Sequence, residues 1–286
     1  MRADRVGSPE IRTLLAIKEK RMIKLILSDM DGTLLDENGQ LPEEFDEVMA
    51  MLKERDILFA PASGRQHDGL QKQFAKYKDD FVFVAENGTY VTYKQQELFS
   101  TTLKEEHVKV LEAAVDEIPG VYTVLCGKKS AYVLSEHPPF VDELSKYYTS
   151  HTLVEDFSQI DDEIIKFTIC DCDQRDAANT IYSKLRRFDG EMQVALSGDC
   201  WVDVMNYGVN KGVAIQRLQQ ILGISARECV AFGDYLNDLE MMGAVRYSFA
   251  MENAHPKIKQ AAAYQAKSNA DHGVMLAIKD MLALGL

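Results

Sequence analysis

The sequence has few cysteines and no long apolar run, and both shortages exclude classes of protein. Its five cysteines include no C-x-x-C pair, which argues against a zinc site and favours reduced thiols in a cytoplasmic protein. No stretch approaches the roughly 20 apolar residues that cross a bilayer as a helix. A P-loop, a G-x-G-x-x-G motif and an H-E-x-x-H motif are also missing, so these nucleotide-binding and zinc-peptidase fingerprints do not apply.

An excess of basic residues is missing too. The formal net charge is −13, which excludes a nucleic acid or an anionic membrane surface as the main partner. An anionic substrate would therefore need local help from a metal ion or a few basic side chains. Hydrophobic residues make up 46% of the 286 residues and charged residues 27%, as in a globular protein with a sizeable core and one or two domains.

The first residues precede a second methionine, Met22. Residues 1–21 contain only a short apolar stretch and no small-residue cleavage site, which argues against a signal peptide. We expect this segment to be either an N-terminal extension that neither the fold nor the activity needs, or the product of a start codon upstream of Met22.

Short apolar runs alternate with helical patterns at both ends of the chain. Strands that alternate with helices predict a parallel sheet with right-handed crossovers. Ser63 precedes the second helical pattern and is placed to cap it. The strands are expected at 22–29, 57–63, 81–88, 228–234 and 247–251, and the helices at 43–56, 64–77, 211–222, 238–245, 255–262 and 273–284.

The middle of the chain has a different texture. Its apolar runs read as antiparallel strand pairs, and Gly198-Asp199 is a good hairpin-turn signal between two of them. We expect Trp201 and the tyrosines of this region to lie in its core. The pairs are 121–127 with 130–135 and 192–198 with 200–206.

These two textures predict two domains. An α/β domain formed by residues 22–102 and 206–286 is interrupted by an α+β domain formed by residues 103–205. In an open α/β sheet, ligands bind beyond the carboxyl ends of the strands, so the functional site is expected there.

Polar side chains gather at those strand ends. Asp29 and Asp31 end the first strand, Ser63 ends the second, and Asp234 ends a later one. Three carboxylates at one sheet edge repel each other unless a cation lies between them. Mg²⁺ fits this need, because it takes oxygen ligands and pairs with phosphate. Further polar residues near these strand ends are Lys211, Asn237 and Asp238.

Each of these residues also has an ordinary structural interpretation. The two aspartates do not open an EF-hand calcium loop, since Leu34 and Gln40 occupy the positions where that loop needs Gly and Glu. Ser63 alone would be a helix cap and Lys211 alone a solvated lysine. Arg65 contacts the substrate or forms a surface salt bridge, and the sequence leaves both alternatives open.

Four motifs carry a family resemblance: DMDGTLL at 29–35, SGR at 63–65, NKG at 210–212 and GDYLNDLEM at 233–241. With them the chain resembles the haloacid dehalogenase (HAD) superfamily of phosphotransferases. Its middle domain resembles the cap of the Cof-like, type IIB branch, and the resemblance covers nearly everything from Met22 onwards. It implies an α/β fold, with a Rossmann-like parallel-sheet core and an inserted α+β cap domain.

The resemblance implies a role for each carboxylate. Asp29 would be the nucleophile that forms an aspartyl-phosphate, and Asp31 would be the general acid and base. Asp29 and Asp234 would bind Mg²⁺ through their carboxylates, and Asp31 through its backbone carbonyl.

The other motif residues would surround the phosphate or support the metal. Ser63 and Lys211 would hold the phosphoryl oxygens, while Asn237 and Asp238 would support the metal or orient Lys211. Backbone N–H groups after Asp29 would add to the anion site. The further phosphate or substrate contacts are Gly32, Thr33, Gly64, Arg65 and Asn87.

These roles imply a Mg²⁺-dependent phosphatase that hydrolyses phosphate monoesters of small metabolites. Sugar phosphates are the first expectation for the substrate, and cofactor phosphates such as flavin mononucleotide or pyridoxal phosphate are the second. Two alternatives stay open: a hexose phosphomutase, and a non-catalytic metabolite-binding regulatory protein on the same fold.

Overall fold

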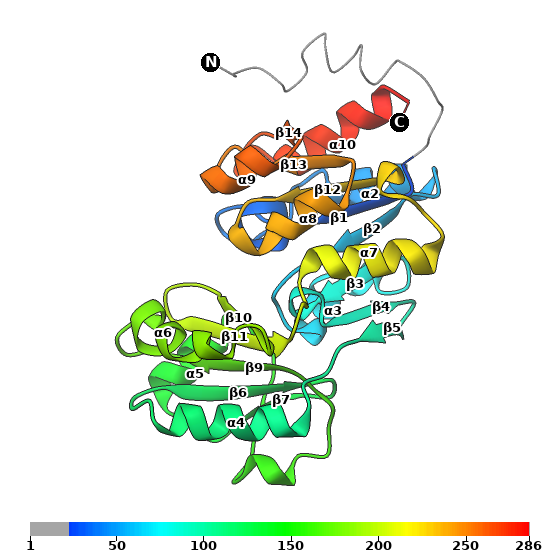
Figure 1. Ribbon diagram of the computed structural model, residues 1–286. Helices are drawn as coiled ribbons and strands as arrows, with labels where there is room; N and C mark the ends of the chain where they lie inside the picture. Colours follow the sequence, from blue (N-terminus) through cyan, green and yellow to red (C-terminus); the bar gives the residue numbers. More distant parts are fainter. Residues whose placement is uncertain (1–22, 286) are drawn as a thin grey trace.

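A parallel five-stranded sheet organises one half of the computed structural model, which describes residues 23–285 (Figure 1). The strand order is β14-β13-β12-β1-β2, and every neighbouring pair is parallel. This confirms the expected α/β architecture and adds one short edge strand, β14. The strands are β1 Leu25–Ser28, β2 Leu58–Pro61, β12 Cys229–Gly233, β13 Tyr247–Ala250 and β14 Tyr264–Gln265.

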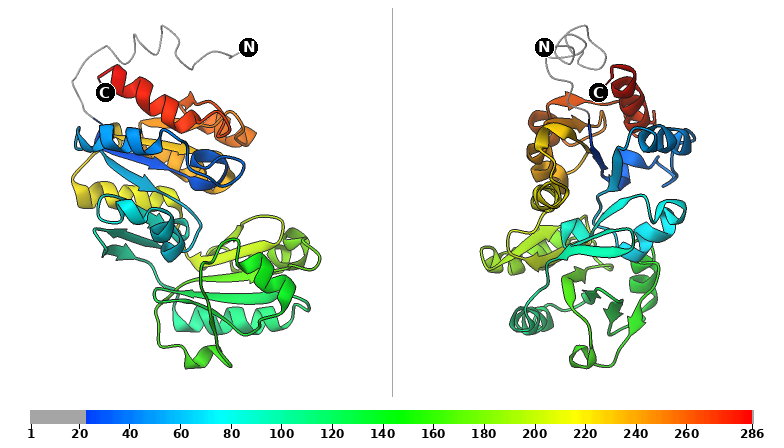
Figure 2. Two further views of the ribbon diagram at one scale, coloured as in Figure 1. Left: turned by 180° about the vertical axis from the view of Figure 1, so that it is seen from behind. Right: turned by 90° about the vertical axis from the view of Figure 1, so that its right-hand side faces the viewer.

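Helices cover both faces of this sheet, which is why its inner strands are continuous apolar runs. Helices α7, α8 and α9 lie on one face, and α2 and α10 lie on the other (Figure 2). The buried side chains of the sheet and these helices form one hydrophobic core. The helices are α2 Phe45–Lys53, α7 Lys211–Leu222, α8 Leu239–Ala244, α9 Pro256–Ala261 and α10 Gly273–Ala283.

A small antiparallel sheet extends this half beyond β2. It contains β3 Val82–Ala85, β4 Tyr90–Tyr93 and β5 Gln96–Ser100, and a single bridge between Ala62 and Val84 joins it to the end of β2.

Helix α3, His67–Gln73, packs against β3. The expectation that Ser63 caps this helix is wrong, because the helix begins at His67 and Gln66 occupies the N-cap position. The Ser63 hydroxyl instead accepts a hydrogen bond from the backbone N–H of Arg65 at 3.1 Å.

A six-stranded sheet organises the other half, in the order β10-β11-β9-β6-β7-β8. Neighbouring strands are antiparallel except for β7 and β8. Helices α4 and α6 pack on one face, and α5 covers part of the opposite face. The elements are α4 Glu105–Asp116, β6 Tyr122–Gly127, β7 Ala131–Val133, α5 Pro138–Leu144, β8 Thr152–Leu153, β9 Ile164–Cys170, α6 Ser183–Leu185, β10 Met192–Leu196 and β11 Trp201–Asn206.

We propose that the domain boundaries lie where the sequence places them. Residues 103–205 are called the cap here, and the rest of the described chain is called the core. Every strand of the six-stranded sheet falls in the cap, apart from the last residue of β11. The single-turn helical segments of the chain are Met30–Leu34, Ala75–Tyr77, Glu86–Gly88, Phe157–Gln159, Ala178–Tyr182, Arg186–Phe188, Ala226–Glu228 and Leu236–Asp238.

The extension expected at residues 1–21 lies outside the described residues. Between residues 23 and 285, no helix has both the length and the apolar composition needed to cross a bilayer. The five cysteines are free thiols.

Candidate active site

Two adjacent parallel strands place two aspartates side by side. Ser28 of β1 pairs in register with Phe232 of β12, so Asp29 and Asp234 follow the carboxyl ends of neighbouring strands. The N–H of Asp29 donates to the carbonyl of Phe232 at 3.0 Å, which ties the first aspartate to the sheet. The tight parallel pairing of β1 and β12 therefore brings together residues 205 positions apart in the chain.

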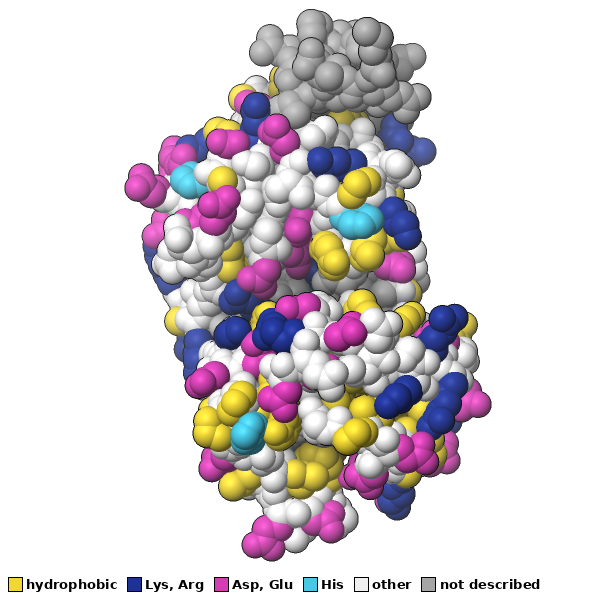
Figure 3. All heavy atoms as spheres, turned by 90° about the vertical axis from the view of Figure 1, so that its left-hand side faces the viewer, with side chains coloured by type: hydrophobic (Ala, Val, Ile, Leu, Met, Phe, Trp, Pro, Cys, Tyr) yellow, Lys and Arg dark blue, Asp and Glu magenta, His cyan; other side chains and the backbone are white. Residues whose placement is uncertain are grey.

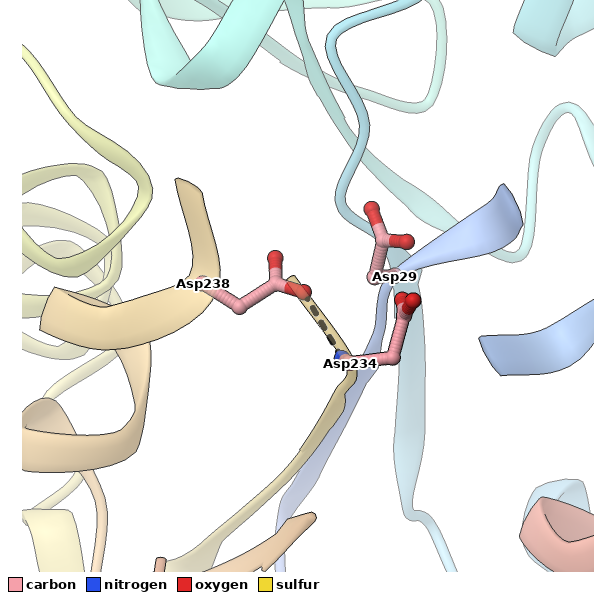
Figure 4. A group of neighbouring side chains, drawn as sticks. All are labelled: Asp29, Asp234 and Asp238. Carbon is pink, nitrogen blue, oxygen red and sulfur yellow. Dashed lines mark hydrogen bonds between the residues drawn. The ribbon is translucent and has the colours of Figure 1, made fainter. Parts of the chain in front are cut away.

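A third carboxylate, that of Asp238, points toward the same place from just before α8 (Figure 4). One of its oxygens accepts the backbone N–H of Asp234 at 3.0 Å. Ligand oxygens of Asp29, Asp234 and Asp238 all lie within 4.8 Å of one another. The expected convergence of carboxylates at the sheet edge is therefore present in the structure.

Lys211 supplies the positive charge among these carboxylates. Its side chain is fully buried, and Nζ lies 2.5 Å from Oδ1 of Asp29 and 2.6 Å from Oδ1 of Asp238. Its position follows from the start of α7, where the Asn210 side chain accepts the N–H of Val213 at 2.9 Å and caps the helix. Burial opposes the charged form, but Asp238 and Asp29 raise the pKa of Lys211 above its ordinary value, so the side chain is an ammonium ion.

One ammonium does not balance three carboxylates. Burial, together with the charge of Asp238, raises the pKa of Asp29 well above its ordinary value, although Lys211 acts in the opposite direction. Burial and Asp238 also raise the pKa of Asp234 to about 6. A further cation would relieve this repulsion, and a donor set made only of oxygens fits Mg²⁺.

Asp31 is not a member of this carboxylate group. Its side chain is about half exposed, and its carboxylate forms a two-point ion pair with Arg65, at 2.8 Å from Nε and 2.5 Å from Nη2. Arg65 is held in turn by Gln73, which accepts from Nη1 at 3.1 Å. Of the two alternatives for Arg65, the structure shows a salt bridge, and that salt bridge lies in the cleft described next.

A cleft of about 720 Å³ separates the core from the cap. The two halves meet along a junction where acidic and basic side chains lie close together and hydrophobic side chains are exposed (Figure 3). The expected site residues that line the cleft are Asp29, Asp31, Ser63, Gly64, Arg65, Asn87, Lys211, Asp234 and Asn237.

Three expected site residues lie behind the cleft wall instead. Asp238 reaches Lys211, as described, and the Thr33 hydroxyl donates to Oδ1 of Asp234 at 2.8 Å. Gly32 has φ +76°, and a Cβ there would lie 2.5 Å from Oδ2 of Asp234, so only glycine fits. Asn253, which the sequence did not single out, donates to the carbonyl of Gly32 at 2.7 Å.

The sequence also missed charged residues at the junction of core and cap. Lys166 and Asp203 line the cleft from cap strands, and both are buried. A signal for them was present, because each is a single charge inside an apolar run, IIKFTIC and CWVDVM. Trp201 and Tyr148 are buried, as expected, but they also line the cleft.

Gly212→Ala is expected to destabilise the protein. Gly212 follows the cleft lysine in α7, and a Cβ there would lie 2.5 Å from the backbone oxygen of Glu240. Overpacking of this kind costs about 1–3 kcal/mol, which lowers the melting temperature by roughly 5 °C in a chain of this size. Gly243→Ala is the matched control, because Gly243 lies in α8 with open space around it. Equal melting temperatures for the two variants would contradict the tight packing of α7 on α8.

Comparisons with known proteins agree with this geometry. The family model of haloacid dehalogenase-like hydrolases matches residues 26–278. The chain is 33% identical to a 5-amino-6-(5-phospho-D-ribitylamino)uracil phosphatase, YbjI of Escherichia coli, over 91% of this chain and 96% of that protein. It is 31% identical to an HMP-PP phosphatase of Escherichia fergusonii, over 83% and 87% of the two chains.

The fold agrees as well. The crystal structure of SMU.1108c from Streptococcus mutans superposes with a TM-score of 0.83 at 31% identity, covering 91% of this chain and 99% of that one. The structure of TM0651 from Thermotoga maritima, at 23% identity, shares the fold with a TM-score of 0.81. The motifs, the fold and these relatives confirm the resemblance, and the chain belongs to the haloacid dehalogenase-like hydrolases and is an enzyme of their phosphatase group.

Proposed function

We propose that the enzyme is a Mg²⁺-dependent phosphatase that hydrolyses phosphate monoesters of small metabolites through an aspartyl-phosphate. The observation that carries this proposal is the contact between the carboxylate of Asp29 and the ammonium of Lys211 at the floor of the cleft. The ammonium neutralises charge on a phosphoryl group held there, while the carboxylate lies beside it as the nucleophile.

The reaction would proceed in two steps on this chain's own residues. In the first, Asp29 forms a bond to phosphorus, the bond to the leaving oxygen breaks, and Asp31 gives that oxygen a proton. In the second, water attacks phosphorus, Asp31 takes a proton from the water, and the bond to Asp29 breaks to release inorganic phosphate. Lys211 and Ser63 hold the phosphoryl oxygens in both. For this role the carboxylate of Asp31 must leave its ion pair with Arg65 and contact the leaving oxygen of the substrate.

The carboxylates of Asp29 and Asp234 would hold Mg²⁺, with the backbone carbonyl of Asp31 as a further ligand. When bound, the ion supplies positive charge that stabilises the charge on the transferring phosphoryl group. Asp238 binds Lys211 at 2.6 Å, which supports a role in orienting the lysine. Asn237 donates to the side chain of Asn87 at 3.3 Å, and both residues line the cleft.

Mg²⁺ is expected to raise the melting temperature more at about pH 7.5 than at about pH 5. The pKa of Asp234 is raised to about 6 in the metal-free protein. Its stabilising protonation is therefore complete below about pH 4 and is lost as the pH rises through about 6. Protons thus compete with the metal at low pH. At a hundredfold excess over its dissociation constant a ligand adds about 2.7 kcal/mol, roughly 5–10 °C here.

Differential scanning fluorimetry with Mg²⁺ and with EDTA measures this shift without any substrate. Asp234→Asn is the control and should show little response to Mg²⁺ at either pH. A shift of the same size at both pH values, or one that survives Asp234→Asn, would place the metal elsewhere.

The cap wall of the cleft favours an uncharged, ring-bearing leaving group. Tyr147, Tyr148 and Trp201 line it, and the exposed side chains of Leu196 and Tyr147 lie at its edge. Aromatic side chains stack on planar rings and on the apolar faces of sugars. We therefore propose cofactor-type phosphates ahead of simple sugar phosphates. The Escherichia coli relative supports this order, because the name of its substrate describes one phosphate on a ribityl chain that is attached to a uracil ring.

The same wall argues against the phosphomutase alternative. A bisphosphate intermediate needs a second anion site on the cap. Among the described residues that line the cleft from the cap, the only lysine or arginine is Lys166, and its charge is already paired with Glu86 and Asp203.

A cytoplasmic location, like the absence of nucleic-acid and membrane partners, stays a prediction.

Phosphate release from a panel of metabolites, with Mg²⁺ and with EDTA, tests the proposed function. The panel contains flavin mononucleotide, pyridoxal phosphate, hexose monophosphates and a hexose bisphosphate. We expect Mg²⁺-dependent release, fastest from ring-bearing monophosphates and slowest from the bisphosphate. Isomerisation of a hexose monophosphate without net release of phosphate would establish the mutase. If none of the compounds in the panel releases phosphate, the proposal is overturned.

A further inference from the structure

Lys166 is a buried charge in an apolar strand of the cap. It lies on β9 between Ile165 and Phe167, and only 2% of the residue is exposed. Residues two apart share one face of a strand, and Thr168 pairs in register with Asp203 of β11. These polar residues therefore share the face of the cap sheet that lines the cleft. A charge buried there requires partners of opposite sign.

Its strongest partner belongs to the core. Nζ of Lys166 lies 2.5 Å from Oε2 of Glu86 and 3.8 Å from Oδ1 of Asp203, and it lies over the ring of Tyr148 at 5.6 Å. Glu86 is 1% exposed, and the described chain offers its Oε2 no other hydrogen-bond partner. We call Lys166, Glu86 and Asp203 the interdomain charge cluster.

Glu86 lies in a turn with an unusual backbone. The residues of Glu86–Gly88 have φ values of +52°, +56° and +95° in succession. Left-handed backbone at a glutamate is uncommon and persists where the surroundings enforce it. A Cβ on Gly88 would lie 2.7 Å from Cβ of Ala214 in α7, so the turn is packed tightly against that helix. The carboxylate of Glu86 is thus presented toward the cap from a rigid support.

This turn also holds the loop formed by residues 63–65, which lines the cleft on the phosphate side. The N–H of Glu86 donates to the carbonyl of Arg65 at 3.1 Å, and the N–H of Asn87 donates to the carbonyl of Ser63 at 2.9 Å. Lys166 completes the arrangement by donating to the carbonyl of Gly64 at 3.3 Å. A cap side chain and a core turn therefore hold the same loop.

We propose that the interdomain charge cluster is a positioning device that couples cap closure to the arrangement of the loop 63–65. Lys166 and Asp203 stay together on neighbouring strands of the cap, where Asp203 also accepts from the hydroxyls of Thr168 and Ser197. Glu86 belongs to the core, so opening the cap separates it from Lys166 and removes the bond to the loop. The inference rests on the proposed phosphatase function, because the loop matters through the phosphoryl group that it binds.

A purely structural role is the alternative, and a second ion pair provides the comparison. Lys128 of the cap binds Glu97 of the core at 3.1 Å, and it does not line the cleft. If interdomain ion pairs only stabilised the contact between cap and core, substitution of either lysine would have the same effect on phosphate binding. If the interdomain charge cluster positions the loop, only Lys166 affects how the enzyme binds phosphate.

The experiment compares Lys166→Met, Glu86→Gln and the double variant with wild type, with Lys128→Met as the matched control. Four quantities are measured: kcat, KM, the dissociation constant of inorganic phosphate with Mg²⁺ by titration calorimetry, and the radius of gyration by X-ray scattering. Thermal unfolding identifies any variant that fails to fold. If a single variant fails to fold, the double variant replaces it in the comparison, because it leaves no unpaired charge from this pair.

We expect Lys166→Met and Glu86→Gln each to raise KM and the phosphate dissociation constant by about tenfold or more, with a larger radius of gyration. The double variant should resemble the single variants, because both changes break one link. Lys128→Met should stay within about twofold of wild type.

Wild-type phosphate affinity and radius in folded Lys166→Met, or equal defects in Lys128→Met, would overturn the proposal. The phosphate and scattering measurements need no turnover. If the wild type binds phosphate but hydrolyses none of the compounds, the proposed function is contradicted. The phosphate-binding and scattering measurements still decide whether the interdomain charge cluster positions the loop.

Discussion

Asp29→Asn is expected to lower phosphate release by at least about 10⁴-fold, as for other enzymes that lose their nucleophile. The amide keeps the shape of the side chain but cannot form the bond to phosphorus. Stability should not fall, because the change removes a carboxylate whose pKa is raised well above its ordinary value by burial and by Asp238. Steady-state phosphate release and the melting temperature, measured on the same preparation, test both statements.

The control for Asp29→Asn is Asp116→Asn, on the exposed face of the cap helix α4. This variant should keep wild-type activity. Retention of a tenth or more of the activity by Asp29→Asn would show that water attacks phosphorus directly and that no aspartyl-phosphate forms.

Lys211→Met is expected both to lower the activity strongly and to destabilise the fold. The ammonium contacts Asp29 and Asp238 and has no exposed surface. Breaking a buried pair by removing one partner typically costs about 3–5 kcal/mol, or roughly 10 °C in melting temperature. Loss of the charge that faces the phosphoryl oxygens should also reduce kcat by about 10²–10³-fold.

A second change separates the two effects of Lys211→Met. Adding Asp238→Asn removes one of the carboxylates left without a counter-charge, so most of the lost stability should return. Activity should not return, because no cation faces the phosphoryl group. Recovery of activity in the double variant, or an unchanged melting temperature in Lys211→Met, would contradict the role given to this lysine.

The elements that the sequence predicted best are long or strongly patterned. Helix α7 and strands β1 and β12 lie within the expected ranges, because buried strands of a parallel sheet are continuous apolar runs. Strands β8 and β14 contain two residues each, and the sequence did not predict them. Two residues carry no periodicity, so only their neighbours in the sheet make them strands.

The placement of Ser63 shows the same limit at one residue. A serine before a helical pattern predicts a cap, yet α3 begins at His67. The loop between Ser63 and the helix is instead held by Glu86 and Asn87, which lie more than twenty residues further along the chain. Local propensity could not reveal that contact.

The sequence by itself determined which residues stand at the ends of the strands. Asp29, Asp31 and Asp234 follow apolar runs, and their motifs identify the family and predict the chemistry before any coordinates are known. Strand position is a local property, set by the order of apolar and polar residues along a few positions of the chain.

Only the tertiary structure decided which charges face each other. It paired Asp31 with Arg65, enclosed Lys211 between two carboxylates, and brought Lys166 of the cap to Glu86 of the core. These partners are 27 to 182 residues apart in the chain, and their contacts depend on the packing of sheets and helices that no local pattern encodes. The sequence therefore predicts the chemistry, whereas the contact between Lys166 of the cap and Glu86 of the core follows only from the tertiary structure.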